Sequence, residues 1–289
     1  MSAAVATRAR FPRAVANLDR YGGAVGRGLE EAGRLAWFSL SSFGHSVHAL
    51  RYYRQETLRQ IIQTVMGAGA VAYVGGAVGI GGFVALSGAS LVAIQGFVSL
   101  GNIGVESFTA FFAAIINVRI AVPVIGGILL ASIIGAGHTA ELGAMRISEE
   151  IDAMDVMGVK SISYLVSTRV IAGVVAVVPL YAGLVSIAFL SPQVTTTLLY
   201  GQSYGTYEHY FRTFLRPEDA FYSFVEIVII AMMVMVTHCY YGYRASGGPV
   251  GVGEAVGRSM RFSLVSIQVV VLLGTLAMYG ANPNFALTV

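Results

Sequence analysis

The segment of the chain richest in reactive side chains is residues 135–158, which holds five carboxylates in a sequence where only 11% of residues are charged. Carboxylates can ligate metals, move protons or attract a basic surface. Anionic lipid headgroups would repel such a segment, so we interpret it as a docking surface for a basic protein. The alternative, a solvated acidic loop that only satisfies topology, stays open. The carboxylates are Glu141, Glu149, Glu150, Asp152 and Asp155.

Capping signals in this segment predict a short helix of about ten residues. Ser148 is placed to cap its N-terminus, and Glu149 and Glu150 suit the positive end of the helix dipole. Gly158 is placed to end the helix. Three apolar residues share one face by their spacing and leave the rest of the surface to the acidic side chains; they are Ile147, Ile151 and Met154.

Catalytic and metal-binding patterns are weak. His138 and Glu141 are three residues apart, but no third ligand has suitable spacing, so we expect no metal site. There is no Walker A motif, because the only lysine, Lys160, follows Val159. Any nucleotide site would therefore lie on another subunit, and we expect no cofactor and no nucleic-acid partner. A stand-alone membrane enzyme that modifies lipids, using Glu141 or His138, remains the alternative function.

Composition indicates a polytopic helical membrane protein, since 56% of the 289 residues are hydrophobic and the mean hydropathy is +0.72. A bilayer core of about 30 Å requires roughly 20 apolar residues per helix. The first apolar run is too long for one simple span, so we divide it into a helix near 61–84 and a re-entrant or interfacial piece near 86–100. The fold class is all-α, with an N-terminal interfacial helix and five transmembrane helices. The uncharged runs are 60–105, 120–137, 170–190, 227–243 and 262–289.

Basic residues set the orientation. Fifteen of the 18 lysines and arginines lie before the first span or in the connections 138–169 and 244–261. These segments are expected in the cytoplasm, which places the N-terminus inside and the C-terminus outside a plasma (inner) membrane. Residues 36–55 carry apolar side chains at helical spacing and predict a helix in the headgroup plane, with an ordinary amphipathic surface helix as the alternative. The expected divisions are a cytoplasmic arm with this helix (1–59), a membrane domain (60–281) and an external tail (282–289).

Two sequence blocks carry a resemblance to a known family. The first runs Gly-x-x-x-Thr-Ala-Glu-Leu-Gly-x-Met and then Glu-Glu-Ile-Asp-Ala-Met-x-x-Met, and the second is Gly-Tyr followed by Gly-Gly-x-x-Gly-Val-Gly. Over roughly residues 45–281 the chain resembles the MlaE/YrbE permeases of ABC lipid transporters, which work with MCE proteins. The motif residues singled out are Thr139, Glu141, Gly143, Gly247, Gly248, Gly251 and Gly253.

The resemblance implies a role for the acidic helix and a set of partners. Residues 147–158 would be the coupling helix that docks on a cytoplasmic ABC ATPase, and two permease subunits would form the pathway. External MCE proteins would carry the lipid, which could be a fatty acid, a sterol or a phospholipid, and import is the expected direction. The coupling residues would be Glu149, Glu150, Ile151, Asp152, Met154 and Asp155.

The chain departs from the family pattern at two places. Many members have an arginine where this chain has Ile133, and an acid after the arginine that here is Arg119, where this chain has Ile120. Ion pairs inside a membrane are costly and usually functional. We therefore expect either that a partner subunit supplies the missing charge or that the path is lined differently. This favours a heterodimer of two non-identical permeases, as in the actinobacterial Mce systems whose YrbE subunits the chain most resembles.

Few charges lie within the apolar runs, which favours a lipid over a polar solute. An ion-coupled carrier would be favoured by inverted repeats, and we find none. Aromatic residues are candidates to line an outward-facing lipid cavity, although packing and interfacial anchoring are the commoner roles of such residues. The candidates are Tyr73, Phe83, Phe97, Phe108 and Phe112.

Overall fold

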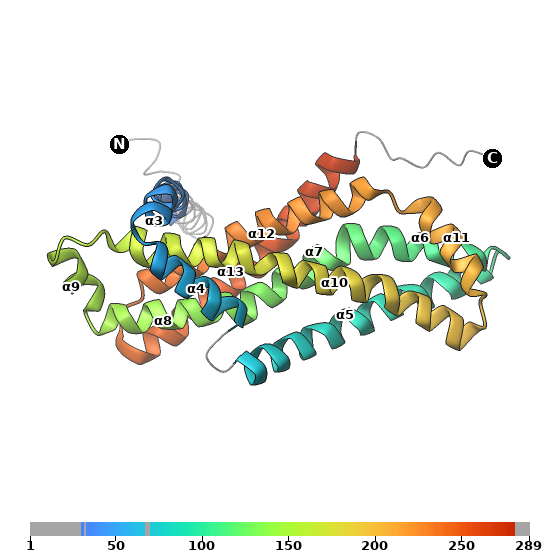
Figure 1. Ribbon diagram of the computed structural model, residues 1–289, viewed down its shortest axis with the longest axis horizontal. Coiled ribbons are helices and arrows are strands. Elements are labelled where there is room, and N and C mark those ends of the chain that lie inside the picture. The colour runs from blue at the N-terminus through green and yellow to red at the C-terminus, as the bar shows by residue number, and fades with distance from the viewer. Residues whose placement is uncertain (1–29, 32, 67–69, 281–289) are drawn as a thin grey trace, which may run out of the picture.

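The protein is an elongated bundle of helices that run along its long axis (Figure 1). The computed structural model describes residues 30–31, 33–66 and 70–280, with the backbone alone at 66 and 70–78. The predicted residues 1–29 of the arm and the tail 282–289 lie outside the described residues. Within the described residues, five helical segments are long and apolar enough to cross a membrane, which confirms the predicted all-α class with five transmembrane helices. They are Gly79–Gly101, Glu106–Ile147, Ile162–Tyr200, Pro217–Tyr243 and Gly248–Tyr279.

Several of these spans combine more than one helical element. The second span runs through a short 3₁₀ turn, α6, a π-helical stretch, α7, a second π-helical stretch and α8. Pro123 lies where the first π-helical stretch passes into α7, and its ring leaves the helix without one N–H donor. The Val118 carbonyl, one π-helical step before it, accepts a hydrogen bond from Ser223 Oγ of α12 at 2.7 Å. The element bounds are α3 (Ser46–Tyr52), α4 (Arg54–Met66), α5 (Ala70–Gly101), η1 (Glu106–Phe108), α6 (Thr109–Phe112), η2 (Ala113–Ala121), α7 (Val122–Leu129), η3 (Leu130–Gly135), α8 (Ala136–Ile147), α9 (Glu150–Val156), η4 (Ile162–Ser167), α10 (Thr168–Tyr200), α11 (Tyr204–Phe214), α12 (Pro217–Tyr243) and α13 (Gly248–Tyr279).

The predicted division of the first apolar run is wrong. The structure has no break near residue 85, because α5 continues from Ala70 to Gly101, and the membrane span is Gly79–Gly101. The start of the run belongs instead to α4, where Gln60 is buried and donates to Glu56 Oε1 at 2.9 Å. Burial raises the pKa of Glu56, but hydrogen bonds from Arg59 and Gln60 more than offset this and lower it. A charged side chain held in this way keeps α4 out of the bilayer core.

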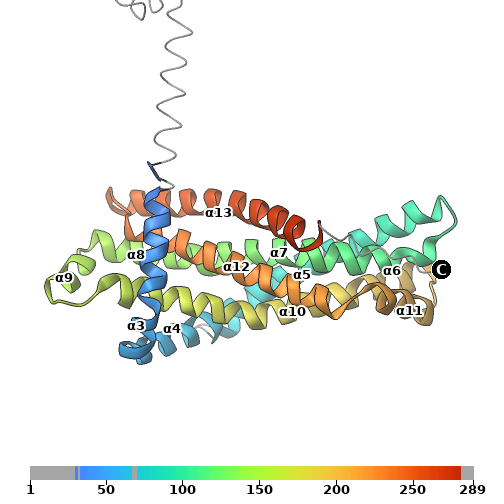
Figure 2. The same ribbon diagram turned by 90° about the horizontal axis from the view of Figure 1, so that it is seen from above.

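The N-terminal helix lies across the bundle rather than along it (Figure 2). Residues 33–44 are helical and lead into α3. One face is anchored, since Ser167 Oγ donates to the Ser42 carbonyl at 2.8 Å and Ala49 is fully buried. The opposite face leaves Trp37 76% and Val47 73% exposed. A crosswise helix with an exposed apolar face is what a position in the headgroup plane requires.

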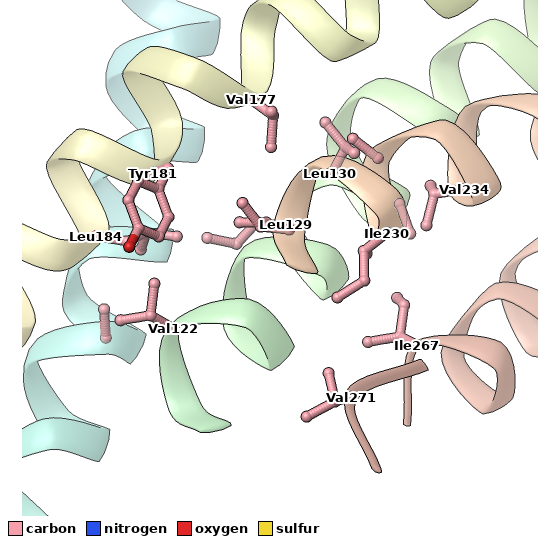
Figure 3. Packing of buried hydrophobic residues seen from close by; sticks show 14 of the residues in the cluster. Val122, Leu129, Leu130, Val177, Tyr181, Leu184, Ile230, Val234, Ile267 and Val271 are labelled. Carbon is pink, nitrogen blue, oxygen red and sulfur yellow. The ribbon is translucent and has the colours of Figure 1, made fainter. Parts of the chain in front are cut away.

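The main hydrophobic core surrounds α7 and η3, which lie between α10, α12 and α13 (Figure 3). Val122, Leu129 and Leu130 pack there against residues of the three neighbouring helices. Glycines allow this close approach, because a Cβ at Gly127 would lie 2.8 Å from Ile230 Cγ2. The core therefore fixes the second span at the centre of the fold, so that α8 leaves the bundle in a defined direction.

Candidate functional site

The acidic helix exists, but it begins differently from the prediction. Ser148 follows the last residue of α8, and its hydroxyl donates to the Ala144 carbonyl at 3.0 Å. It therefore caps the end of α8, and the predicted N-cap role is wrong. The N-cap of α9 is Glu149, whose φ of +62° is rare for a residue with a side chain. Gly158 follows α9 with a φ of +78°, as expected of a residue that ends a helix.

α9 is anchored by one apolar residue and presents its acidic residues to solvent. Ile151 is fully buried and packs with Leu142 and Leu165, while Met154 packs against the same cluster. Ile147 is 37% exposed and does not complete the predicted apolar face. We call the exposed side chains the α9 surface, and it lies at one extremity of the bundle (Figure 1). Its members are Glu149, Glu150, Asp152 and Asp155, together with the exposed apolar Val156 and Met157.

An ion pair fixes α9 to the helix before it. Arg146 of α8 donates to Asp152 Oδ1 of α9, so that Asp152 is engaged within the chain. Ion pairs of exposed side chains contribute little stability, but this one spans the sharp turn between the two helices. Glu149, Glu150 and Asp155 are the acids of the α9 surface that remain available for a basic partner, although Glu150 also accepts a hydrogen bond from Ser148 at 2.9 Å.

The two motif blocks, about a hundred residues apart in sequence, meet where α8 crosses α12 and α13. Thr139 is fully buried, and its hydroxyl lies 2.8 Å from His238 Nδ1 and 3.3 Å from Ser259 Oγ. The same hydroxyl lies 3.1 Å from the carbonyls of Gly135 and His238. This polar cluster joins α8, α12 and α13. A movement of α8 would therefore strain its hydrogen bonds to α12 and α13.

Glycines of the motif blocks make the crossing possible. A Cβ at Gly242 would lie 2.8 Å from the Thr139 carbonyl oxygen, and one at Gly143 would lie 2.9 Å from Val252 Cγ1. Gly247 and Gly248 have φ values of +91° and +72°, which glycine adopts without strain, and they lead into α13. Gly251 lies against the Ser246 carbonyl. The space around Gly253 is open, and nothing in the structure explains a glycine there.

Glu141 forms an ion pair with a distant arginine. Its Oε2 lies 3.0 Å from Arg169 Nη2 of α10 and 3.6 Å from His138 Nδ1. Arg169 is 2% exposed, so the carboxylate provides the counter-charge that a buried guanidinium needs. Among the described residues, no three metal-ligating side chains gather into a site. His138 and Glu141 thus belong to a polar network in which His138 and Arg169 are buried and Glu141 is half-exposed.

A cavity of about 540 Å³ lies between α4, α5, α10 and the η3–α8 part of the second span. The polar side chains of its wall come from α4 and α8, and the rest of the wall is apolar. His138 and Glu141 are one and two helical turns beyond Ile134, so the polar part is the part nearer α9. Ile133, one of the two positions at which the sequence departs from the pattern it resembles, is one of the apolar wall residues.

The aromatic candidates lie elsewhere. Phe97 stacks on Tyr200 with ring centroids 4.1 Å apart, and Phe108 contacts Tyr210 at 4.7 Å. Phe112 packs beside Phe111, and Phe83 is 70% exposed. The side chain of Tyr73 lies outside the described residues. The four described aromatics are absent from the wall of the 540 Å³ cavity, and their contact with lipid stays a prediction.

Arg119 has its acidic partner in the same chain. Its Nη2 lies 3.0 Å from Asp219 Oδ1, and its guanidinium lies over the Tyr279 ring at 4.1 Å from the centroid. The expectation that a partner subunit supplies this charge is therefore wrong. Asp219 was missed because it lies outside the uncharged run 227–243, from which this span was predicted. The available signal was Arg119 itself, since an arginine in an apolar span requires a counter-charge.

Comparisons with known proteins agree with the arrangement of the motifs. A family model described as Permease MlaE matches residues 66–277. TRIGALACTOSYLDIACYLGLYCEROL 1, chloroplastic, of Arabidopsis thaliana is 32% identical over 145 residues, which are 50% of this chain and 41% of the relative. A probable ABC transporter permease protein of Rickettsia bellii is 27% identical over 57% of this chain and 64% of its own length.

A further relative is the Haemophilus influenzae intermembrane phospholipid transport system permease protein MlaE, 22% identical over 66% of this chain and 74% of its own length. The matches to the first two relatives thus span 41% and 64% of those proteins. The family match covers most of the membrane region and sets aside the alternative of a stand-alone lipid-modifying enzyme. The chain belongs to the MlaE family of ABC transporter permeases, and it is a non-catalytic, multi-pass membrane subunit.

Proposed function

We propose that this chain is the membrane subunit of an ATP-driven lipid transporter and that a separate ATPase docks on the α9 surface. The observation that carries the proposal is the construction of α9. Ile151 fixes the helix in the core while Glu149, Glu150 and Asp155 face solvent. A basic groove on the ATPase would complement these charges. Val156, 89% exposed, would add an apolar contact at the centre of such an interface.

The connection from α9 to the bundle supports transmission of movement. The Arg146–Asp152 ion pair and the buried Ile151 hold α9 against α8 and the start of α10. Further along α8, the Thr139 cluster contacts α12 and α13. A displacement of α9 by a docked ATPase would therefore reach three spans through packed side chains and hydrogen bonds.

A lipid is the proposed substrate because the Haemophilus influenzae relative is named for phospholipid transport and the cavity described above is largely apolar. We further propose that the chain is a YrbE-type subunit that pairs with a second, non-identical permease and works with external MCE proteins in import. A stripe on α13 supports a second subunit, because its exposed apolar residues recur every three or four positions. They are Val265, Val269, Leu272 and Leu276.

The test is affinity purification of the tagged chain in mild detergent, followed by mass spectrometry and an ATPase assay. The variant Glu149→Lys, Glu150→Lys, Asp155→Lys reverses the available charges and leaves Asp152 paired with Arg146. We expect the native chain to bring down an ATPase and a second permease, and the variant to lose the ATPase alone. Glu254→Lys, a reversal of an exposed acid on α13, is the control and should retain it.

Two outcomes would contradict the proposal. An ATPase that remains bound to the triple variant would place the docking site elsewhere on the chain. A native chain that purifies without any ATPase would remove the basis for ATP-driven transport.

A further inference from the structure

The 540 Å³ cavity has the size of a pocket for a small amphiphile. Its wall has a polar part and an apolar part, as an amphiphile does. Gln60 and Thr64 of α4 and His138 and Glu141 of α8 supply polar atoms on the side nearer α9. Apolar residues, most of them from α7, η3 and α10, form the remainder. A lipid headgroup would lie among the polar atoms and its hydrocarbon among the apolar residues, which include Leu129, Ile133, Leu180, Leu184 and Ile187.

Two polar atoms of this wall have no hydrogen-bond partner among the described residues. His138 is 9% exposed, and its Nε2 is buried without a partner. Thr64 Oγ1 is buried and unpartnered in the same way. Such atoms are uncommon in native structures, where buried polar groups are satisfied by protein, water or ligand. Both residues line the same cavity, so one bound group could satisfy both atoms.

The environment of His138 indicates which hydrogen bonds a bound group would have to donate and accept. His138 Nδ1 faces Glu141 Oε2 at 3.6 Å, so we assign the ring proton of the neutral imidazole to Nδ1. The Nε2 atom then carries an unshared lone pair and accepts a hydrogen bond. Thr64 can donate one. A hydroxyl group, which both donates and accepts, matches the two atoms.

Charge narrows the ligand class further. Glu141 is the one formally charged side chain among the described residues of the wall, and Arg169 already pairs with it at 3.0 Å from outside the wall. An anionic headgroup, such as a phosphate or a carboxylate, would meet the Glu141 carboxylate and no free cation in the wall. An uncharged headgroup avoids this repulsion.

We propose that this cavity binds an uncharged lipid with a hydroxyl headgroup, which donates to His138 Nε2 while the hydrocarbon lies along η3 and α10. This inference rests on the proposed function, because it names the substrate class of the transporter. The ligand would enter the half of the bundle nearer α9, between the interfacial helix α4 and the spans.

The test uses three probes with the same hydrocarbon chain: oleyl alcohol, oleate and oleylamine. The chain is purified with its partners and placed in lipid nanodiscs, and displacement of radiolabelled oleyl alcohol is measured. We expect oleyl alcohol to compete at least about tenfold better than oleate, and His138→Phe to weaken it by about tenfold, the effect of one lost hydrogen bond. His138→Gln, which keeps an acceptor, should lose less.

Filling the cavity provides the control for location. Gly183 of α10 and Gly137 of α8 line the cavity, and a Cβ at either would meet no atom within 4 Å. Gly183→Leu and, independently, Gly137→Leu should therefore fold normally and abolish specific binding. Gly101→Leu, at a glycine that also has open space but lies outside the cavity wall, should bind as the native chain does.

Equal or tighter binding of oleate, or unchanged oleyl alcohol binding in both filled variants, would overturn the inference. Association with the ATPase distinguishes a failure of the cavity assignment from a failure of the proposed function. A chain that retains its ATPase but binds no oleyl alcohol overturns the cavity assignment alone. A chain that binds oleyl alcohol but never associates with an ATPase overturns the transport function on which the assignment rests.

Discussion

Replacing Asp219 by asparagine should destabilise the end of the bundle opposite α9. Asp219 Oδ1 pairs with Arg119, and Asp219 Oδ2 accepts the backbone N–H of Arg216 at 3.3 Å, which caps α12. Asparagine keeps an oxygen for the cap but removes the negative charge. The variant therefore isolates the ion pair from the cap, which Asp219→Ala would remove as well.

The expected magnitude follows from the burial of the pair. The side chains of Arg119 and Asp219 are 10% and 6% exposed. Removing one partner of a buried ion pair costs about 3–5 kcal/mol, because the other charge stays buried without compensation. The Tyr279 ring, 4.1 Å from the guanidinium, faces the cation in the native chain and in the variant alike, so it does not reduce this loss. At about 2–4 °C per kcal/mol for a chain of this size, the melting temperature should fall by roughly 6–20 °C.

The assay is size-exclusion chromatography of the purified chain after heating in one detergent. Asp219→Ala should lose about 1 kcal/mol more than Asp219→Asn, because the cap is lost as well. The double variant Arg119→Met with Asp219→Asn should recover most of the stability, since no buried charge is left unpaired. A melting temperature of Asp219→Asn within about 2 °C of the native value would refute the reasoning.

Three further changes test the helix crossing and a buried hydroxyl, each by the same thermal assay. Gly242→Ala should cost about 1–3 kcal/mol because its Cβ would meet the Thr139 backbone, whereas Gly253→Ala, in open space, should be neutral or slightly stabilising. Thr139→Val should cost about 1–3 kcal/mol by leaving the buried His238 unpaired, and Thr139→Ser should cost less. Burial raises the pKa of Tyr207, and its hydroxyl has no hydrogen-bond partner among the described residues. Tyr207→Phe should therefore raise stability by up to about 1 kcal/mol at neutral pH, because it removes an unsatisfied buried hydroxyl. A loss of stability would indicate a hydrogen bond that the structure does not show.

The spans were predictable because an uncharged apolar run of bilayer length is rarely found outside a membrane. The division of the first apolar run was not predictable, because it depended on whether the Gln60 side chain could find a hydrogen-bond partner where α4 packs on the bundle. Its amide donates to Glu56 within α4, and the helix packs on α10. A count of apolar residues carries no information about such a partner. Without a proline or a charge between residues 86 and 100, nothing breaks α5 there.

The candidate site was predictable only in its local part. The acids and Gly158 lie within ten consecutive residues, and their place in and after a short helix was predicted from spacing. Ser148 could serve the end of α8 or the start of α9 equally well, and the structure uses its hydroxyl on the Ala144 carbonyl. The Arg119–Asp219 pair joins residues a hundred positions apart, and the cavity wall is drawn from six elements: α4, α5, α7, η3, α8 and α10. Long-range contacts of this kind have no signature in a single sequence.

The length of the second span has a mechanical consequence. Its 42 residues at about 1.5 Å each give a rod of roughly 60 Å, twice the hydrocarbon thickness of about 30 Å. The core around α7 holds the rod at its middle (Figure 3). Its α8 end packs on α12 and α13, and its α6 end packs on α5 and α11. A displacement passed along the rod would therefore be divided between two separate groups of helices, one at each of its ends.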